Sequence, residues 1–227
     1  MKLFDISEYA VMAVFSEQET DVNQLLNCRQ QLRQHPAVTE VILGYQSITV
    51  YFRIDQSDHA SLKQELTVLF SQKKEKPVQG VLHRIPVCYE QAYGIDIEHL
   101  SEYHQLTFEQ IIRLHTTPTY DVCFLGFSPG FPFLSGLNPE LATPRKETPR
   151  THVPTGAVGI AGHQTGIYPA SSPGGWQIIG QTPIDLLTLE DTEHPTLLQP
   201  GDQLQFYAIS SEDYHNIQKK ERDSRDH

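Results

Sequence analysis

The sequence predicts an α+β protein in two parts: a sheet-and-helix domain over residues 1–89 and a β-barrel over residues 119–210. Three observations lead to this fold class. Strand-like and helical patterns alternate through the first ninety residues. The stretch Gly126–Gly180 gathers ten of the chain's fourteen glycines and eight of its fifteen prolines, yet keeps many apolar side chains. From residue 120 onward, short apolar runs follow one another at the spacing of barrel strands.

Composition and charge exclude several classes of protein. The 227 residues carry a formal net charge of −11 and no Lys/Arg-rich run, which argues against nonspecific binding of nucleic acid. The three cysteines, Cys28, Cys88 and Cys123, lie too far apart to suggest a disulfide framework or a zinc ribbon. The N-terminal residues lack the apolar core of a signal peptide, and no apolar run approaches the roughly 18 residues of a membrane helix. We therefore expect a soluble, cytoplasmic protein.

The sequence pattern predicts the order β-α-β-β-α-β for the first domain, which is the arrangement of ferredoxin-like domains. Pro36 ends the first helical pattern, and Asp58 can cap the second, in which Leu62 and Leu66 belong to an apolar stripe. The domain holds no cluster of catalytic residue types, so we expect a scaffold or a docking surface. The predicted elements are a strand in 7–16, a helix in 22–35, a hairpin in 38–52, a helix in 58–70 and a strand in 80–89.

Residues 90–118 are expected to form a bridge of two short helices. Thr107 and Gln110 have the spacing of a capping box, and Pro118 ends the helix that follows. His115 falls in the last turn, where it either complements the helix dipole or points into a cleft that begins at Tyr120. The polar, mixed-charge tail over residues 211–227 is expected to be a frayed helix or disordered, and no function is assigned to it.

The dense segment Gly126–Gly180 allows two interpretations: an ordinary turn-rich β-domain, or turns packed around a binding cleft. Its only basic residues are Arg145, Lys146 and Arg150, in a chain that is strongly acidic. Guanidinium groups beside glycine-lined turns are suited to carboxylate or phosphate, which favours an anion site. The alternative is that these residues are surface charges held by proline turns.

Known cofactor and nucleophile motifs are missing from this segment. Its Gly-x-x-Gly-x-x-Gly rhythm is not the dinucleotide fingerprint, and no P-loop occurs in the sequence. His152 and His163 are isolated, so we expect solvated side chains and no metal site. Gln164 and Tyr168 could donate to or accept from a small polar substrate. Trp176, the one tryptophan, follows two glycines that would let backbone approach its ring.

The motifs GFSPGFPFLSGL, LATPRKETPRTHVPTGAVGIAG, QTGIYP and SPGGWQIIGQTP resemble those of the KipI/PxpB family, and the resemblance extends over nearly the whole chain. Members of this family have been called allophanate hydrolase subunit 1, and many are assigned as the B subunit of prokaryotic 5-oxoprolinase. The resemblance implies a ferredoxin-like N-terminal domain followed by a cyclophilin-like β-barrel. An alternative function within the family is that of a regulatory protein that inhibits a sensor histidine kinase.

The resemblance implies ATP-dependent opening of 5-oxoproline to L-glutamate, in a complex with a PxpC-like (KipA-like) and a PxpA-like subunit. ATP, with Mg²⁺, is then expected at the level of the complex. Within the matching motifs, the residue types that suit catalysis are Arg150, Arg145, His115, Gln164 and Tyr168. Those expected to bind the substrate are Gly162, Thr165, Gly174, Gly175 and Trp176.

Overall fold

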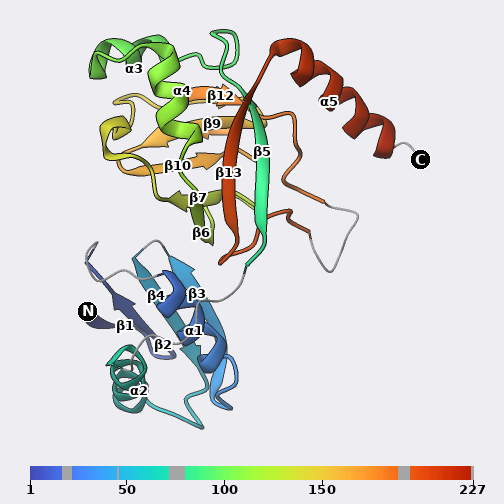
Figure 1. Ribbon diagram of the computed structural model, residues 1–227. Helices are drawn as coiled ribbons and strands as arrows, with labels where there is room; N and C mark the ends of the chain where they lie inside the picture. The colour runs from blue at the N-terminus through green and yellow to red at the C-terminus, as the bar shows by residue number, and fades with distance from the viewer. Residues whose placement is uncertain (17–21, 45, 72–79, 189–194, 226–227) are drawn as a thin grey trace. The chain divides into compact units, whose positions relative to one another are not determined.

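The computed structural model describes residues 1–16, 22–44, 46–71, 80–188 and 195–225, and Figure 1 shows their helices and strands. The chain divides into two compact units, Met1–Gln79 and Gly80–His227. None of the helices in the described ranges combines the length and the apolar character that crossing a membrane requires.

The first unit is a four-stranded antiparallel sheet in the order β1-β2-β4-β3, with both helices packed on one face. Its core is formed by apolar side chains such as Val11, Ile48 and Val50 from the sheet and Leu62 and Leu66 from a helix. The elements are β1 (Lys2–Ser7), β2 (Ala10–Val14), α1 (Val22–Leu32), β3 (Val38–Gly44), β4 (Ser47–Phe52) and α2 (His59–Ser71).

The predicted hairpin and helices of this unit are confirmed. Strands β3 and β4 pair from Val38↔Phe52 to Gly44↔Ser47. The carboxylate of Asp58 accepts a hydrogen bond from the Ser61 N–H (2.8 Å) at the start of α2, so it caps that helix as expected.

The β-α-β-β-α-β order is wrong at its two ends. The single strand predicted in 7–16 is the second half of a hairpin, because Lys2–Ser7 forms β1 and pairs with β2. The strand predicted in 80–89 is β5 (Leu82–Cys88), and it belongs to the second unit. The physical reason is that β1 already occupies the edge of the sheet beside β2, while β5 finds a seven-residue parallel partner in β13 (Gln203–Ile209).

The second unit contains a closed barrel in the order β10-β7-β6-β13-β5-β12-β9, which confirms the predicted barrel and adds β5 to it. The closure is consistent with the cyclophilin-like barrel that the resemblance implies. The parallel pair β5 and β13 is seen side by side in Figure 1, from Leu82↔Gln203 to Cys88↔Ile209. The other barrel strands are β6 (Tyr120–Leu125), β7 (Pro132–Ser135), β9 (Ala157–Ala161), β10 (Gln164–Ile167) and β12 (Gln177–Gln181).

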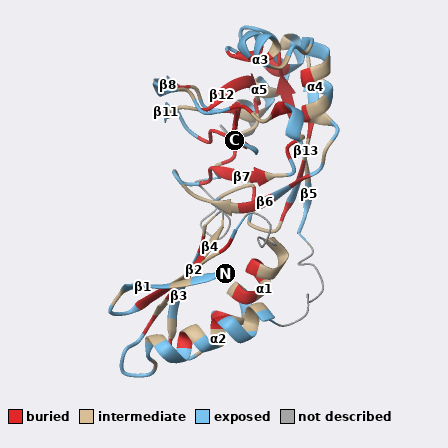
Figure 2. Ribbon diagram, turned by 90° about the vertical axis from the view of Figure 1, so that its left-hand side faces the viewer, coloured by how far each residue is buried: buried red, intermediate tan, exposed pale blue. Residues whose placement is uncertain are grey.

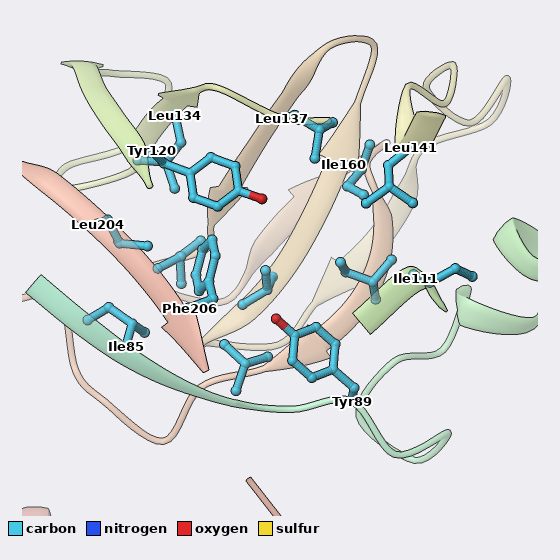
Figure 3. Packing of buried hydrophobic residues seen from close by; sticks show 14 of the residues in the cluster. Ile85, Tyr89, Ile111, Tyr120, Leu134, Leu137, Leu141, Ile160, Leu204 and Phe206 are labelled. Carbon is cyan, nitrogen blue, oxygen red and sulfur yellow. The ribbon is translucent and has the colours of Figure 1, made fainter. Parts of the chain in front are cut away.

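Apolar side chains fill the barrel, and helices α3 (Ile97–His104) and α4 (Phe108–Thr116) contribute to the same core through residues such as Leu100 and Ile111. Figure 3 shows the rings of Tyr89, Tyr120 and Phe206 inside this cluster, with both hydroxyl groups directed inward. The predicted capping box of α4 is confirmed, since Thr107 and Gln110 each bond to the other's backbone N–H.

Three further elements complete the second unit. The tail, for which a frayed helix or disorder was expected, forms helix α5 (Ser211–Arg225), and the buried ring of Tyr214 packs against Tyr93 (centroids 4.6 Å apart). Strands β8 (Arg150–Val153) and β11 (Ser172–Gly174) form a small two-stranded sheet of mostly exposed and half-buried residues (Figure 2). A 3-10 turn, η1, spans Pro139–Leu141.

Candidate functional site

An aromatic pocket of about 400 Å³ opens in the second unit. Its walls come from the β6–β7 turn, the loop before β8, the end of β10 and strand β11, so distant parts of the sequence meet there. The ring of Phe131 makes T-shaped contacts with those of Tyr168 (5.1 Å) and Trp176 (5.3 Å), and the three rings belong to one buried apolar cluster. The lining residues are Phe127, Phe131, Phe133, Arg145, Pro149, Tyr168, Pro173, Gly174, Gly175 and Trp176.

The β6–β7 turn places two of the lining rings through unusual backbone geometry. Gly130 has φ +75°, and Phe127, a non-glycine residue, has φ +69°. Backbone hydrogen bonds from Gly126 N to Phe131 O (3.1 Å) and from Phe131 N to Ser128 O (3.1 Å) close the turn. Phe127 is left 68% exposed at the pocket, in a left-handed conformation that bulky residues rarely adopt.

Gly174 allows strand β11 to lie against the buried ring of Tyr168. A Cβ at residue 174 would come within 2.3 Å of the Tyr168 hydroxyl oxygen, whereas a Cβ at the neighbouring Gly175 would meet nothing closer than 3.6 Å. Tyr168 is 1% exposed and packs against Phe131, so its ring has little room to move. Glycine at position 174 is therefore required for the shape of the pocket.

Gly174→Ala is expected to displace Tyr168 and to lower the free energy of unfolding by about 1–3 kcal/mol, as overpacking does. Gly175→Ala is the matched control, because its methyl group would make only ordinary contacts. Urea denaturation of both variants measures the difference. Equal stability of the two variants would contradict this packing of β11 on Tyr168.

Arg145 supplies the positive charge at the pocket wall. Its guanidinium carbon lies 6.0 Å from the centroid of the Trp176 ring, within the range of a cation–π contact. Across the described part of the chain, the guanidinium makes no hydrogen bond and no ion pair, and the side chain is exposed. Arg145 is therefore available to an anion that enters the pocket.

Lys146 and Arg150 are engaged differently, although the sequence places them in the same basic loop. Both bind one carboxylate oxygen of the buried Asp96: the Arg150 Nη2 at 2.6 Å and the Lys146 Nζ at 3.1 Å. Burial alone would raise the pKa of Asp96, but hydrogen bonds from Arg150, the Ile178 N–H and Lys146 hold that pKa below its ordinary value. The basic loop is thus divided into one available cation and two that are bound to Asp96.

The structure brings together five of the ten residues that the sequence singled out: Arg145, Tyr168, Gly174, Gly175 and Trp176 all line the pocket. Arg150 does not line the pocket: it pairs with the lining residue Gly174 in the β8–β11 sheet, and its side chain binds Asp96. Gly162 forms the turn between β9 and β10, with φ +59° and an exposed position. Gln164 pairs with Ala161 at the start of β10, also away from the pocket.

His115 and Thr165 lie in the barrel core and not in the pocket. The Thr165 hydroxyl donates to Gly159 O (3.0 Å), so it accepts from His115 Nε2–H (2.9 Å), while His115 Nδ1 accepts from the Tyr89 hydroxyl (2.8 Å). The imidazole is fully buried and stacks on Phe206, and this burial lowers its pKa to about 3. His115 is therefore a neutral residue of the core. It does not complement the helix dipole as a cation, and it does not point into the pocket.

Reasoning from the sequence missed Asp96 and the aromatic and proline residues of the wall. The aromatic residues gave a signal, since GFSPGFPF places three phenylalanines among turn residues. Asp96 gave none, because its partners Lys146 and Arg150 are 50 and 54 residues further along the chain. The residues that the sequence missed are Asp96, Phe127, Phe131, Phe133, Pro149 and Pro173.

A family model described as carboxyltransferase domain, subdomain C and D, matches residues 1–198, and the chain belongs to this family. The fold agrees, because the Kluyveromyces lactis urea carboxylase contains a region that superposes on 96% of this chain with a TM-score of 0.76 at 20% identity. That region spans 22% of the urea carboxylase chain, and the likeness concerns the fold alone.

Within this family, the chain is similar to proteins named as the B subunit of 5-oxoprolinase. The Bacillus subtilis (strain 168) protein is 43% identical over 184 residues, which cover 79% of this chain and 76% of that protein. The Haemophilus influenzae (strain ATCC 51907 / DSM 11121 / KW20 / Rd) protein is 42% identical over 210 residues, covering 91% and 97%. These matches confirm the family resemblance predicted from the glycine- and proline-rich motifs.

Proposed function

We propose that this chain is the B subunit of an ATP-dependent 5-oxoprolinase, which converts 5-oxo-L-proline to L-glutamate and is active only in a complex. The observation that carries the proposal is the aromatic pocket with one available guanidinium, in a chain whose relatives are named as 5-oxoprolinase B subunits. That name implies an enzyme of several subunits, and we propose a PxpC-like and a PxpA-like partner.

The pocket suits the chemistry of 5-oxoproline. Its volume of about 400 Å³ is within the range of small-molecule sites. The methylene groups of a five-membered ring would lie against the faces of Trp176 and Phe131, where apolar surface is removed from water. The carboxylate of the substrate would bind Arg145, because a guanidinium presents paired N–H donors that match a carboxylate.

The described residues that line the pocket do not fit a magnesium nucleotide. They include no carboxylate to bind Mg²⁺, and Arg145 is the one cation among them for a triphosphate. We therefore propose that ATP and Mg²⁺ are held by one of the partner proteins. The chemistry that ATP supplies there is activation of the lactam oxygen as a leaving group, which a resonance-stabilised amide requires. The part of this chain is to hold and orient the ring.

The test is reconstitution. The purified chain, mixed with its PxpA-like and PxpC-like partners, ATP, Mg²⁺ and 5-oxoproline, is expected to release glutamate and phosphate in equal amounts. Omission of this chain should abolish the release of both. A complex whose assembly is verified by gel filtration, yet which releases no glutamate, would contradict the proposal. Inhibition of a sensor histidine kinase by the chain alone would favour the regulatory alternative.

A further inference from the structure

Asp96 uses its carboxylate in an unusual way for its position. It precedes helix α3 at the N-cap, where an aspartate ordinarily accepts a hydrogen bond from the first turn of its own helix. Here the side chain makes no capping bond. One oxygen accepts from Arg150 and Lys146, and the other accepts from the Ile178 N–H (2.7 Å). The carboxylate thus connects α3, strand β12 and the basic loop.

The loop that carries Arg145 is held on both sides of that residue. Before it, Pro144 O accepts a hydrogen bond from the Gln177 side chain (3.1 Å). After it, Lys146 N donates to Gly175 O (2.7 Å), while the Lys146 side chain reaches Asp96. Among the described residues the Arg145 guanidinium makes no hydrogen bond and no ion pair, and it lies over the Trp176 ring. The position of Arg145 is therefore set by its neighbours and not by a partner of its own.

We propose that Asp96 is a positioning residue of the pocket: by binding Lys146 and Arg150 it fixes the loop that holds Arg145 over Trp176, so that Arg145 receives the carboxylate of a ring substrate. Asp96 does not line the pocket and does not touch the substrate. The inference rests on the proposed function only where it takes the ring substrate to be 5-oxoproline.

The charges of Asp96, Lys146 and Arg150 explain why their ion pairs would hold the loop in place. Asp96 is 4% exposed, and its carboxylate is the anion that both Lys146 and Arg150 bind. Without this carboxylate, Lys146 and Arg150 would be two partly buried cations without an ion pair. Keeping them in their present positions would cost free energy, so both side chains would favour positions closer to water. Arg145 lies between Pro144 and Lys146 and would move with them. A displacement of about 1 Å in a binding group can lower activity by about a hundredfold.

The test compares two buried aspartates. Asp96→Asn keeps the shape of the side chain but removes its charge. Asp202→Asn is the matched control, because Asp202 is also buried and accepts from two backbone N–H groups and from His83, away from the pocket. Trp176 is the only tryptophan, so its fluorescence emission reports binding of 5-oxoproline in the pocket. We expect the Kd of Asp96→Asn to rise at least about tenfold, and that of Asp202→Asn to stay within about twofold.

Equal effects of the two substitutions, or no effect of Asp96→Asn, would overturn the inference. If Asp96→Asn does not fold, as judged by circular dichroism, then Lys146→Gln decides. That substitution removes one of the two ion pairs, so we expect it to weaken binding, and wild-type affinity would overturn the proposal.

Benzoate, a ring carboxylate without a lactam, separates the inference from the proposed function. Emission changes with benzoate but not with 5-oxoproline, weakened by Asp96→Asn, would support the positioning role and contradict the 5-oxoprolinase assignment. Binding of 5-oxoproline that is unaffected by Asp96→Asn would contradict the positioning role alone. No change of emission with either carboxylate would overturn both.

Discussion

Arg145→Gln is expected to lower kcat/KM for 5-oxoproline in the reconstituted complex by about 10- to 150-fold. The magnitude is that of a lost hydrogen bond to a charged group, about 1.5–3 kcal/mol. Arg145 lines the pocket, and in the described structure its guanidinium has no hydrogen-bond or ion-pair partner. It therefore gives up no such bond when it binds a carboxylate. The loss is expected in KM more than in kcat, because the carboxylate is not the reacting group.

Two further variants show whether the loss comes from the guanidinium of Arg145. Arg113→Gln removes an exposed cation of α4 that does not line the pocket, and it should leave kcat/KM unchanged. Arg145→Lys keeps the charge but lacks the paired donors of the guanidinium, so an intermediate loss is expected. Wild-type kinetics in Arg145→Gln would show that the substrate carboxylate is bound elsewhere.

Acid is expected to destabilise the second unit through His115, by about 3–5 kcal/mol between pH 7 and pH 3. Burial lowers the pKa of this imidazole to about 3 in the folded state, whereas the unfolded state has the ordinary value near 6.5. Between these values the unfolded chain binds a proton that the folded chain does not. The contribution to stability is therefore complete above about pH 6.5 and is lost as the pH falls towards 3.

The measurement is the free energy of unfolding in urea at pH 7 and at pH 4 for the wild type and His115→Gln. Glutamine can still bond to Tyr89 and Thr165 but does not titrate, so this variant is expected to lose less stability on acidification. His163→Gln is the control, because His163 is exposed at the β9–β10 turn. Parallel pH profiles for the wild type and His115→Gln would contradict the burial of a neutral imidazole.

Local signals predicted the helices of this protein well. The capping box at Thr107 and Gln110 and the apolar stripe through Leu62 and Leu66 are determined by residues a few positions apart. The hairpin of β3 and β4 is equally local. In each of these elements the sequence pattern and the structure depend on the same short-range contacts.

The partners of distant segments could not be predicted in this way. Leu82–Cys88 has the pattern of a strand, but nothing in it indicates that its parallel partner is Gln203–Ile209 and not a strand of the first sheet. The same holds for the site. The sequence pattern predicted a basic loop. That Arg145 lies over Trp176 while the other two cations bind Asp96 depends on contacts between residues 31 to 54 positions apart.

The proposed function requires that the aromatic pocket beside Arg145 binds 5-oxoproline. A crystal structure of the chain with 5-oxoproline would show whether it does. We expect the ring to lie against Trp176 and Phe131, with its carboxylate within hydrogen-bond distance of the Arg145 guanidinium. A ligand bound outside the pocket, or bound in it with its carboxylate directed away from Arg145, would contradict this binding mode.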